Sequence, residues 1–131
     1  GIKMADGKDV TIIATGITVA MALEARTLLA AEGIDAAVVN IHTIKPLDRE
    51  LVVSEAGRTG AIVTAEEHNI IGGLGEAVSA VTSESNPVPV LRVGIEDAFG
   101  RSGKVPALLE KYGLTSSAIA EKARAAIALK R

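Results

Sequence analysis

The sequence of 131 residues contains no cysteine and no tryptophan. The absence of cysteine excludes disulfide bonds, thiolate nucleophiles and cysteine-ligated metals, and it is compatible with a cytoplasmic location. Aromatic residues make up 2% of the chain, namely Phe99 and Tyr112, so flat platforms on which bases or rings could stack are missing. Chemistry that depends on thiols or on aromatic stacking is therefore not expected here.

The sequence also lacks a strong excess of positive or negative charge. Fourteen Lys and Arg residues stand against sixteen Asp and Glu, and the formal net charge is −2. Nucleic acids and anionic membranes bind concentrated basic surfaces, so neither is predicted as a partner. Although 48% of the residues are hydrophobic, no apolar run approaches the ~18 residues of a membrane-spanning helix. We therefore predict no membrane span.

The main pattern is an alternation of short apolar segments with stretches of helical spacing. Buried strands are predicted at 10–15, 36–41, 61–66 and 89–94, because these runs are rich in β-branched residues and apolar on both faces. Such strands are typical of mostly parallel sheets covered by helices on both sides. The length suits one core, so 1–131 is predicted to be a single α/β domain.

Helices are predicted where apolar residues recur at helical spacing. They cover five segments: after Gly16 up to Gly33, from Asp48 to about Ala56, from the glycine stretch to about Glu84, over 105–113, and after Thr115. Asp48 and Thr115 are the predicted N-caps, because their side-chain oxygens can accept hydrogen bonds from the first helical N–H groups.

The stretch TAEEHNIIGGLGEAV, residues 64–78, holds the most suggestive chemistry. A glycine-rich turn between a strand and a helix can bind phosphate through its backbone N–H groups. However, a G-x-G-x-x-G pattern from Gly73 would need glycine where Val78 stands, and no Walker Gly-Lys-Ser/Thr is present. We favour the interpretation that Gly72, Gly73 and Gly75 permit close packing, either inside the domain or against another chain.

Glu66, Glu67 and His68 are candidates for acid–base chemistry, because a histidine beside carboxylates can titrate near neutral pH. Successive side chains of a strand point to opposite faces, so only Glu66 and His68 could share a site. A solvated or interface histidine is the favoured interpretation. The other histidine, His42, lies at a different strand end, and no spacing such as HExxH occurs. The sequence predicts no metal site.

The segment GIEDAFGRSG, residues 94–103, follows the fourth strand at the edge where open α/β sheets bind ligands. A surface ion pair of Asp97 with Arg101, contributing about 0–1 kcal/mol, is favoured over a ligand site. Ser102 follows an arginine instead of a strand and does not form a nucleophile elbow. No catalytic residue is predicted from this segment.

Several motifs together resemble the C-terminal domain of transketolases. They are DVTIIATG (9–16), VVNIHTIKPLD (38–48), IVTAEEHNIIGGLGEAV (62–78), and GIEDAFGRSG followed by LLEKYGLTSSAI (94–119). The β subunits of 2-oxoacid dehydrogenases and 1-deoxy-xylulose-5-phosphate synthases share this domain, but EEH with Asn69 and GGLG favours transketolase. The resemblance implies a three-layer α/β/α fold. Its mixed, mostly parallel sheet of about five strands would begin with an antiparallel edge strand that includes Ile2 to Met4.

The resemblance also implies the activity of a longer parent enzyme. Transketolases are cytoplasmic homodimers of the pentose phosphate pathway that transfer a two-carbon ketol unit between sugar phosphates, using thiamine diphosphate. In this family the cofactor and Mg²⁺ are held by two other domains, through a GDG…N motif and an activating glutamate. This chain matches neither of these. It is therefore predicted to be a non-catalytic fragment whose partners are the remaining transketolase domains or subunit.

Within this family the domain helps form the dimer and supports the active-site walls from behind. The segment that faces neighbouring domains corresponds to Glu66–Gly75. The predicted interdomain or dimer contacts are accordingly Glu66, Glu67, His68, Asn69, Gly72, Gly73 and Gly75, with no catalytic, cofactor or metal role assigned to them. Two alternatives stay open: a parent that is a 2-oxoacid dehydrogenase β subunit or a 1-deoxy-xylulose-5-phosphate synthase, and a stand-alone regulatory module that binds a small ligand.

Overall fold

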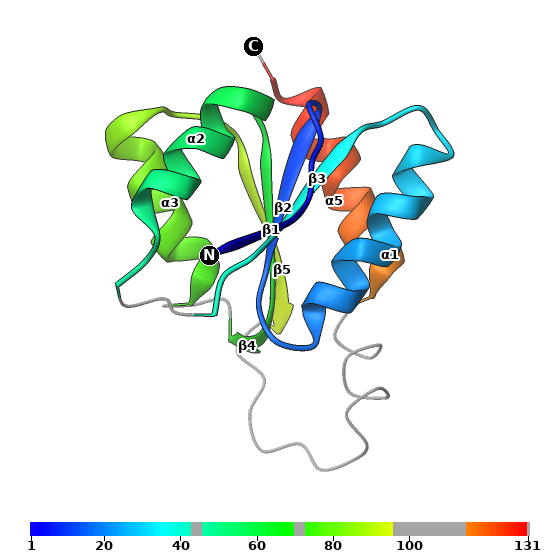
Figure 1. Cartoon of the computed structure of the whole chain (residues 1–131), viewed down its shortest axis with the longest axis horizontal. Helices are drawn as coiled ribbons and strands as arrows, with labels where there is room; N and C mark the ends of the chain where they lie inside the picture. The colour runs from blue at the N-terminus through cyan, green and yellow to red at the C-terminus, as the bar shows by residue number, and fades with distance from the viewer. Residues whose placement is uncertain (43–45, 70–72, 96–114, 131) are drawn as a thin grey trace.

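A five-stranded sheet forms the centre of the molecule, with the strand order β1-β3-β2-β4-β5 (Figure 1). It is seen in a computed structural model that describes residues 1–42, 46–69, 73–95 and 115–130. The strands are β1 (Ile2–Ala5), β2 (Val10–Ala14), β3 (Ala36–Asn40), β4 (Ile62–Asn69) and β5 (Val90–Ile95). β1 is antiparallel to β3, and the other neighbours are parallel. The predicted mixed sheet with an antiparallel edge strand is confirmed.

Helices cover both faces of the sheet and complete three layers (Figure 1). One face carries α1 (Thr18–Ala30) and α5 (Ser116–Ala128), and the other carries α2 (Arg49–Thr59) and α3 (Leu74–Ser85). Both predicted N-caps are confirmed. Asp48 Oδ1 accepts a hydrogen bond from the Leu51 N–H at 3.2 Å. Thr115 Oγ1 accepts one from the Ala118 N–H at 3.1 Å. The helix predicted over 105–113 lies outside the described residues.

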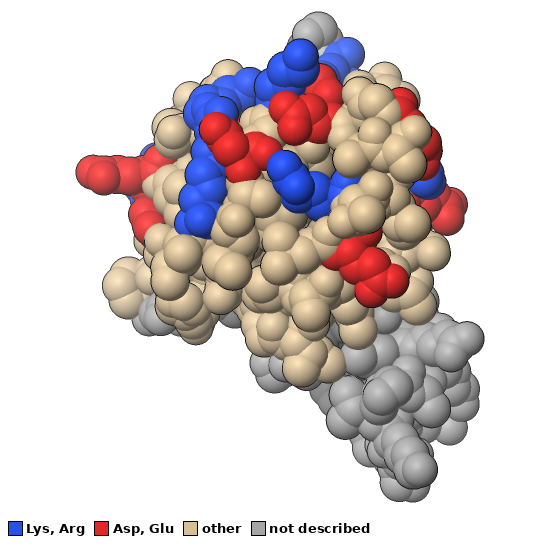
Figure 2. All heavy atoms as spheres, turned by 45° about the vertical axis from the view of Figure 1, so that its right-hand side comes forward, with Lys and Arg blue, Asp and Glu red and all other residues tan. Residues whose placement is uncertain are grey.

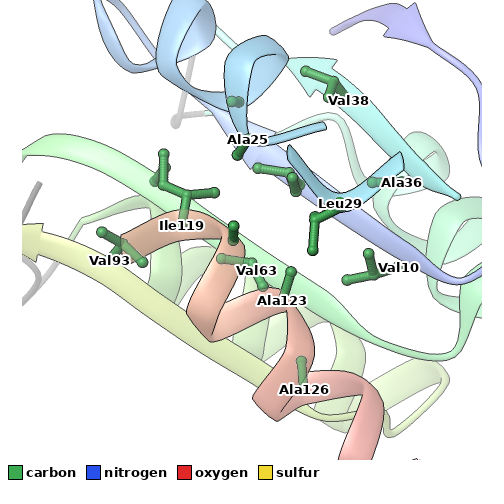
Figure 3. Packing of buried hydrophobic residues seen from close by; sticks show 14 of the residues in the cluster. Val10, Ala25, Leu29, Ala36, Val38, Val63, Val93, Ile119, Ala123 and Ala126 are labelled. Carbon is green, nitrogen blue, oxygen red and sulfur yellow. The ribbon is translucent and has the colours of Figure 1, made fainter. Parts of the chain in front are cut away.

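Small side chains build the core between the sheet and the α1 and α5 layer (Figure 3). The residues labelled in Figure 3 are Val10, Ala36, Val38, Val63 and Val93 from the strands, Ala25 and Leu29 from α1, and Ile119, Ala123 and Ala126 from α5. Alanine ends at Cβ, so both helices can lie close to the sheet and to each other at the density of a protein interior. Such a thin layer has little room for rings, which agrees with the scarcity of aromatic residues.

Charged side chains fasten the edge strand β1 to the domain. Lys3 Nζ lies 3.0 Å from Asp6 Oδ1 and 3.0 Å from Glu55 Oε2. Arg58 contacts the same two carboxylates, at 2.6 Å and 3.3 Å. Glu55 is buried, and its Oε1 accepts a hydrogen bond from Thr11 Oγ1 at 3.2 Å. Because a buried carboxylate must be paired and hydrogen bonded to be tolerated, this network ties β1 to α2 and β2.

Acid should weaken the attachment of β1. Hydrogen bonds from Arg58 and Lys3 hold the pKa of Asp6 well below its ordinary value. The unfolded chain, in which this pKa is ~3.9, therefore takes up its proton at a higher pH than the folded chain. The stabilisation is complete above about pH 5 and is lost as the pH falls further. Asp6→Asn should lower the thermal midpoint near neutral pH and flatten its decline towards about pH 2.

Thermal unfolding followed by circular dichroism between these pH values tests this expectation. The control is Glu24→Gln, which changes an exposed acid on α1. The difference in thermal midpoint between wild type and Asp6→Asn should shrink as the pH falls. A difference in midpoint that stays constant across the pH range would contradict the ion-pair network.

Candidate interdomain contact site

The predicted contact residues lie at the carboxyl edge of the sheet, where β4 ends and α3 begins. β4 continues beyond its predicted end at Glu66 and reaches Asn69, which pairs with Ile95 of β5 after a register shift. α3 starts after the N-cap Gly73, whose backbone is extended. The backbone of the EEHN segment is therefore strand, and it leads into the glycine turn.

Several predicted positions are outside the described part of the site. They are the side chains of Glu67, His68 and Asn69, the whole of Gly72, and the polar residues of the segment after Ile95. The predicted opposition of Glu67 to Glu66 and His68, and the predicted Asp97–Arg101 ion pair, stay predictions. His42, on the strand end of β3, is exposed.

Glu66 is a buried carboxylate that caps α3 from the neighbouring strand. The residue is 2% exposed, and its Oε2 accepts a hydrogen bond from the backbone N–H of Gly75 at 3.1 Å. The first N–H groups of a helix have no partner within the helix and carry the positive end of its dipole. The chain thus supplies, at the Gly75 N–H, the negative charge that a phosphate would supply in an anion-binding loop.

Neighbouring side chains of the same domain leave no room for a side chain at position 75. A Cβ at Gly75 would overlap the side chain of Arg92 on β5, and it would lie 2.9 Å from Thr64 Oγ1 on β4. Thr64 is buried, and protein interiors are closely packed, so a shift of this side chain would be costly. The close approach predicted for the glycine stretch is therefore confirmed at Gly75, where it joins α3 to its own sheet. A contact of Gly75 with another domain stays a prediction.

A threonine that sequence reasoning missed joins three elements at the same edge. Thr18 is fully buried at the start of α1, and its single hydroxyl proton is shared between two carbonyl oxygens, that of Thr15 at 2.5 Å and that of Ala65 on β4 at 2.8 Å. The same oxygen accepts a hydrogen bond from the Thr15 N–H at 3.1 Å, just after β2. No catalytic or binding motif contains this threonine. The signal that the sequence offered was its position shortly after the predicted strand 10–15.

The polar groups described at this edge bind the backbone of the chain itself. Among the residues with described positions, no group of three or more His, Asp and Glu side chains could hold a metal ion. In the same part of the chain, no helix is both long and apolar enough to cross a bilayer. The hydrogen bonds of Glu66 Oε2 and Thr18 Oγ1 to the backbone fix the shape of the carboxyl edge.

A pocket of about 460 Å³ lies at the opposite, amino edge of the sheet. It is lined by Gly60, Pro87, Val88, Pro89 and Leu129. These residues follow the last turns of α2, α3 and α5, far along the strands from Glu66. The alternative of a small-ligand module predicted binding at the carboxyl ends of the strands, and this pocket does not support that location.

Comparison with known proteins establishes the family. The family described as "Transketolase, C-terminal domain" matches residues 2–119. The chain belongs to the transketolase C-terminal domain family. A solved structure described as a split gene transketolase, inactive beta4 tetramer, has a TM-score of 0.92 and 54% identity, covering 99% of this chain and 42% of that chain. The resemblance and the three-layer transketolase C-terminal fold are confirmed.

Two curated relatives carry the same domain within longer proteins. The 6-deoxy-6-sulfo-D-fructose transketolase subunit SqwH of Clostridium sp. (strain MSTE9) is 52% identical over 118 residues, which are 90% of this chain and 37% of that protein. The 1-deoxy-D-xylulose-5-phosphate synthase of Heliobacterium modesticaldum (strain ATCC 51547 / Ice1) is 48% identical over 125 residues, 95% of this chain and 19% of that protein. This transketolase C-terminal domain thus spans well under half the length of these relatives.

Removal of the Glu66 carboxylate should weaken the start of α3. Glu66→Ala leaves the buried Gly75 N–H without its acceptor and removes a negative charge from the positive end of the helix. We expect the free energy of unfolding to fall by about 1–3 kcal/mol. Glu66→Gln keeps an oxygen acceptor and should lose less than about 1 kcal/mol.

Urea unfolding of the two variants measures these losses, and hydrogen exchange at the Gly75 amide shows where they arise. Faster exchange at this amide is expected in Glu66→Ala. Unchanged stability and unchanged exchange would show that Glu66 does not cap the helix.

Proposed function

We propose that this chain is the C-terminal domain of a thiamine diphosphate-dependent transketolase, which transfers a two-carbon ketol unit between sugar phosphates. The observation that carries the proposal is the 54% identity to the split gene transketolase over 99% of this chain. The 52% identity to a transketolase subunit supports the same enzyme class. In the parent, thiamine diphosphate and Mg²⁺ are held by other domains, and the enzyme works as a cytoplasmic homodimer.

The part of this domain in that enzyme is to provide a rigid contact surface. Glu66 Oε2 and Thr18 Oγ1 bind the backbone of the domain, so the carboxyl edge has a defined shape before any partner arrives. The contact itself is made by the segment from Glu66 to Gly75, with Glu67, His68, Asn69, Gly72 and Gly73 as the remaining contact residues. The domain alone is non-catalytic.

The position of the first residue supports a contact at this edge. Because β1 is antiparallel to its neighbour, Ile2 pairs with Asn40 at the carboxyl end of β3. The Gly1 nitrogen lies 3.0 Å from Asp48 Oδ2, at the start of α2. A preceding segment of the kind that the longer relatives contain would therefore join this domain at the carboxyl edge of the sheet.

A second candidate is a parent of the synthase type. The 48% identity to a 1-deoxy-D-xylulose-5-phosphate synthase over 95% of this chain favours it. The contact role of the carboxyl edge would be the same in that parent, but the reaction product would differ.

The product made by the full-length parent distinguishes the two candidates. The purified parent is supplied with thiamine diphosphate and Mg²⁺ and assayed for ketol transfer from a ketose phosphate to an aldose phosphate, and separately for 1-deoxy-D-xylulose 5-phosphate. We expect ketol transfer by the parent and no turnover by residues 1–131 alone. Formation of the deoxy sugar would favour the synthase, and turnover by the isolated chain would contradict the contact role.

A further inference from the structure

We propose that the starts of α1 and α5 form a second docking surface at the carboxyl edge, which is covered in the parent by the domain that precedes this one. The inference rests on the proposed function. The surface, here called the shoulder, consists of Gly16, Ile17, Ala20, Met21, Ser117 and Ala118, all exposed or half-buried. α1 and α5 pack against each other and both begin at this edge (Figure 1).

The shoulder lacks charged side chains, although the same two helices carry many charges farther along. α1 has no charged residue before Glu24, and α5 has none before Glu121. Towards the amino edge, Glu32 and Arg124 join the two helices through a hydrogen bond of 2.8 Å. In Figure 2, Lys, Arg, Asp and Glu lie mainly on the upper part of the visible face, whereas its lower part is largely tan apart from one acidic patch.

This distribution runs against the usual preferences of helix starts. Asp and Glu are favoured in the first turn because they interact with the positive end of the helix dipole, yet neither α1 nor α5 has one there. Depletion of charge is instead typical of the core of a protein–protein interface, where a charge would lose its hydration. The starts of both helices therefore suit contact with another protein surface.

Ile17 forms the apolar centre of the shoulder. It is 43% exposed and occupies the N-cap of α1, where no side-chain cap is formed. Its backbone is already helical, and the N–H groups of the next two residues donate to the carbonyls of Thr15 and Gly16, so no side-chain cap is needed there. The exposed isoleucine leaves apolar surface in water, and this cost is offset if a partner buries it.

The inferred occupant is the preceding domain, because that domain would reach this edge first. The pairing of Ile2 with Asn40 places the junction at the carboxyl edge, beside the start of α2, where the Gly1 nitrogen lies 3.0 Å from Asp48 Oδ2. A domain attached there would reach the shoulder by extending along this edge to the other face of the sheet, and the related chains extend far beyond this domain, which covers 37% and 42% of them. The shoulder also continues into the Glu66 turn. Thr18, directly after Ile17, donates to the carbonyl of Ala65, the neighbour of Glu66. One partner surface can therefore cover both.

The test compares Ile17→Lys with Leu28→Lys in the full-length parent. Leu28 is a matched control because it is 40% exposed and lies on the same stripe of α1, roughly 16 Å farther along the helix. Ile17→Lys should lower kcat/KM for ketol transfer by about tenfold or more, as expected for a charge buried at the centre of an interface. It should also speed limited proteolysis at the junction before Gly1. Leu28→Lys should change neither by more than about twofold.

Thermal unfolding of residues 1–131 carrying each substitution completes the design. Leu28→Lys should leave the midpoint unchanged, whereas Ile17→Lys should lower it by only about 1–4 °C, because its charge lies at the positive end of the α1 dipole. A clearly larger loss with Ile17→Lys would show that the chain itself covers the shoulder, and this would overturn the inference. Equal activity and equal proteolysis for the two variants in a parent that catalyses ketol transfer would also overturn it, while the proposed function would stand. If the wild-type parent lacks ketol transfer, the proposed function fails, and proteolysis alone decides the docking.

Discussion

Burial of the sheet on both faces is the constraint on which the rest of this structure depends. Every residue of β2 is buried, and alanine-rich helices lie close against one face. Because a buried charge is costly unless it is paired and hydrogen bonded, the buried carboxylates lie at the margins of the sheet. Glu55 at the β1 margin and Glu66 at the carboxyl edge are the two buried carboxylates of the described core, and both bind groups of the domain itself.

The carboxyl edge combines internal polar bonds with an uncharged exterior. Glu66 and Thr18 hold the starts of α3 and α1 against the strands, while exposed positions such as Ile17 and Ala20 carry no charge. The opposite end of the α1 and α5 face is rich in charged side chains (Figure 2). One end of this face is therefore uncharged and suits contact with another protein surface, whereas the other end is charged and suits contact with water.

In the role proposed above, the domain contributes to the parent enzyme through rigidity. Glu66 Oε2 and Thr18 Oγ1 bind backbone N–H and C=O groups of the domain itself. Thiamine diphosphate enzymes depend on precise placement of the cofactor and substrate by several domains. A preformed edge lowers the cost of ordering those contacts, because loops and side chains need not be immobilised on assembly.

The sequence by itself determined the order of strands and helices, the caps Asp48 and Thr115, and the family, because these depend on local periodicity, on capping chemistry and on ordered motifs. Only the tertiary structure decided what the polar residues do. Glu66 accepts a hydrogen bond from Gly75, nine positions away, and Thr18 and Glu55 have hydrogen-bond partners that are 47 and 44 positions away. β4 likewise continued past Glu66 because Asn69 found a partner on β5. Contacts of this range arise only when the chain is folded, so no local pattern specifies them.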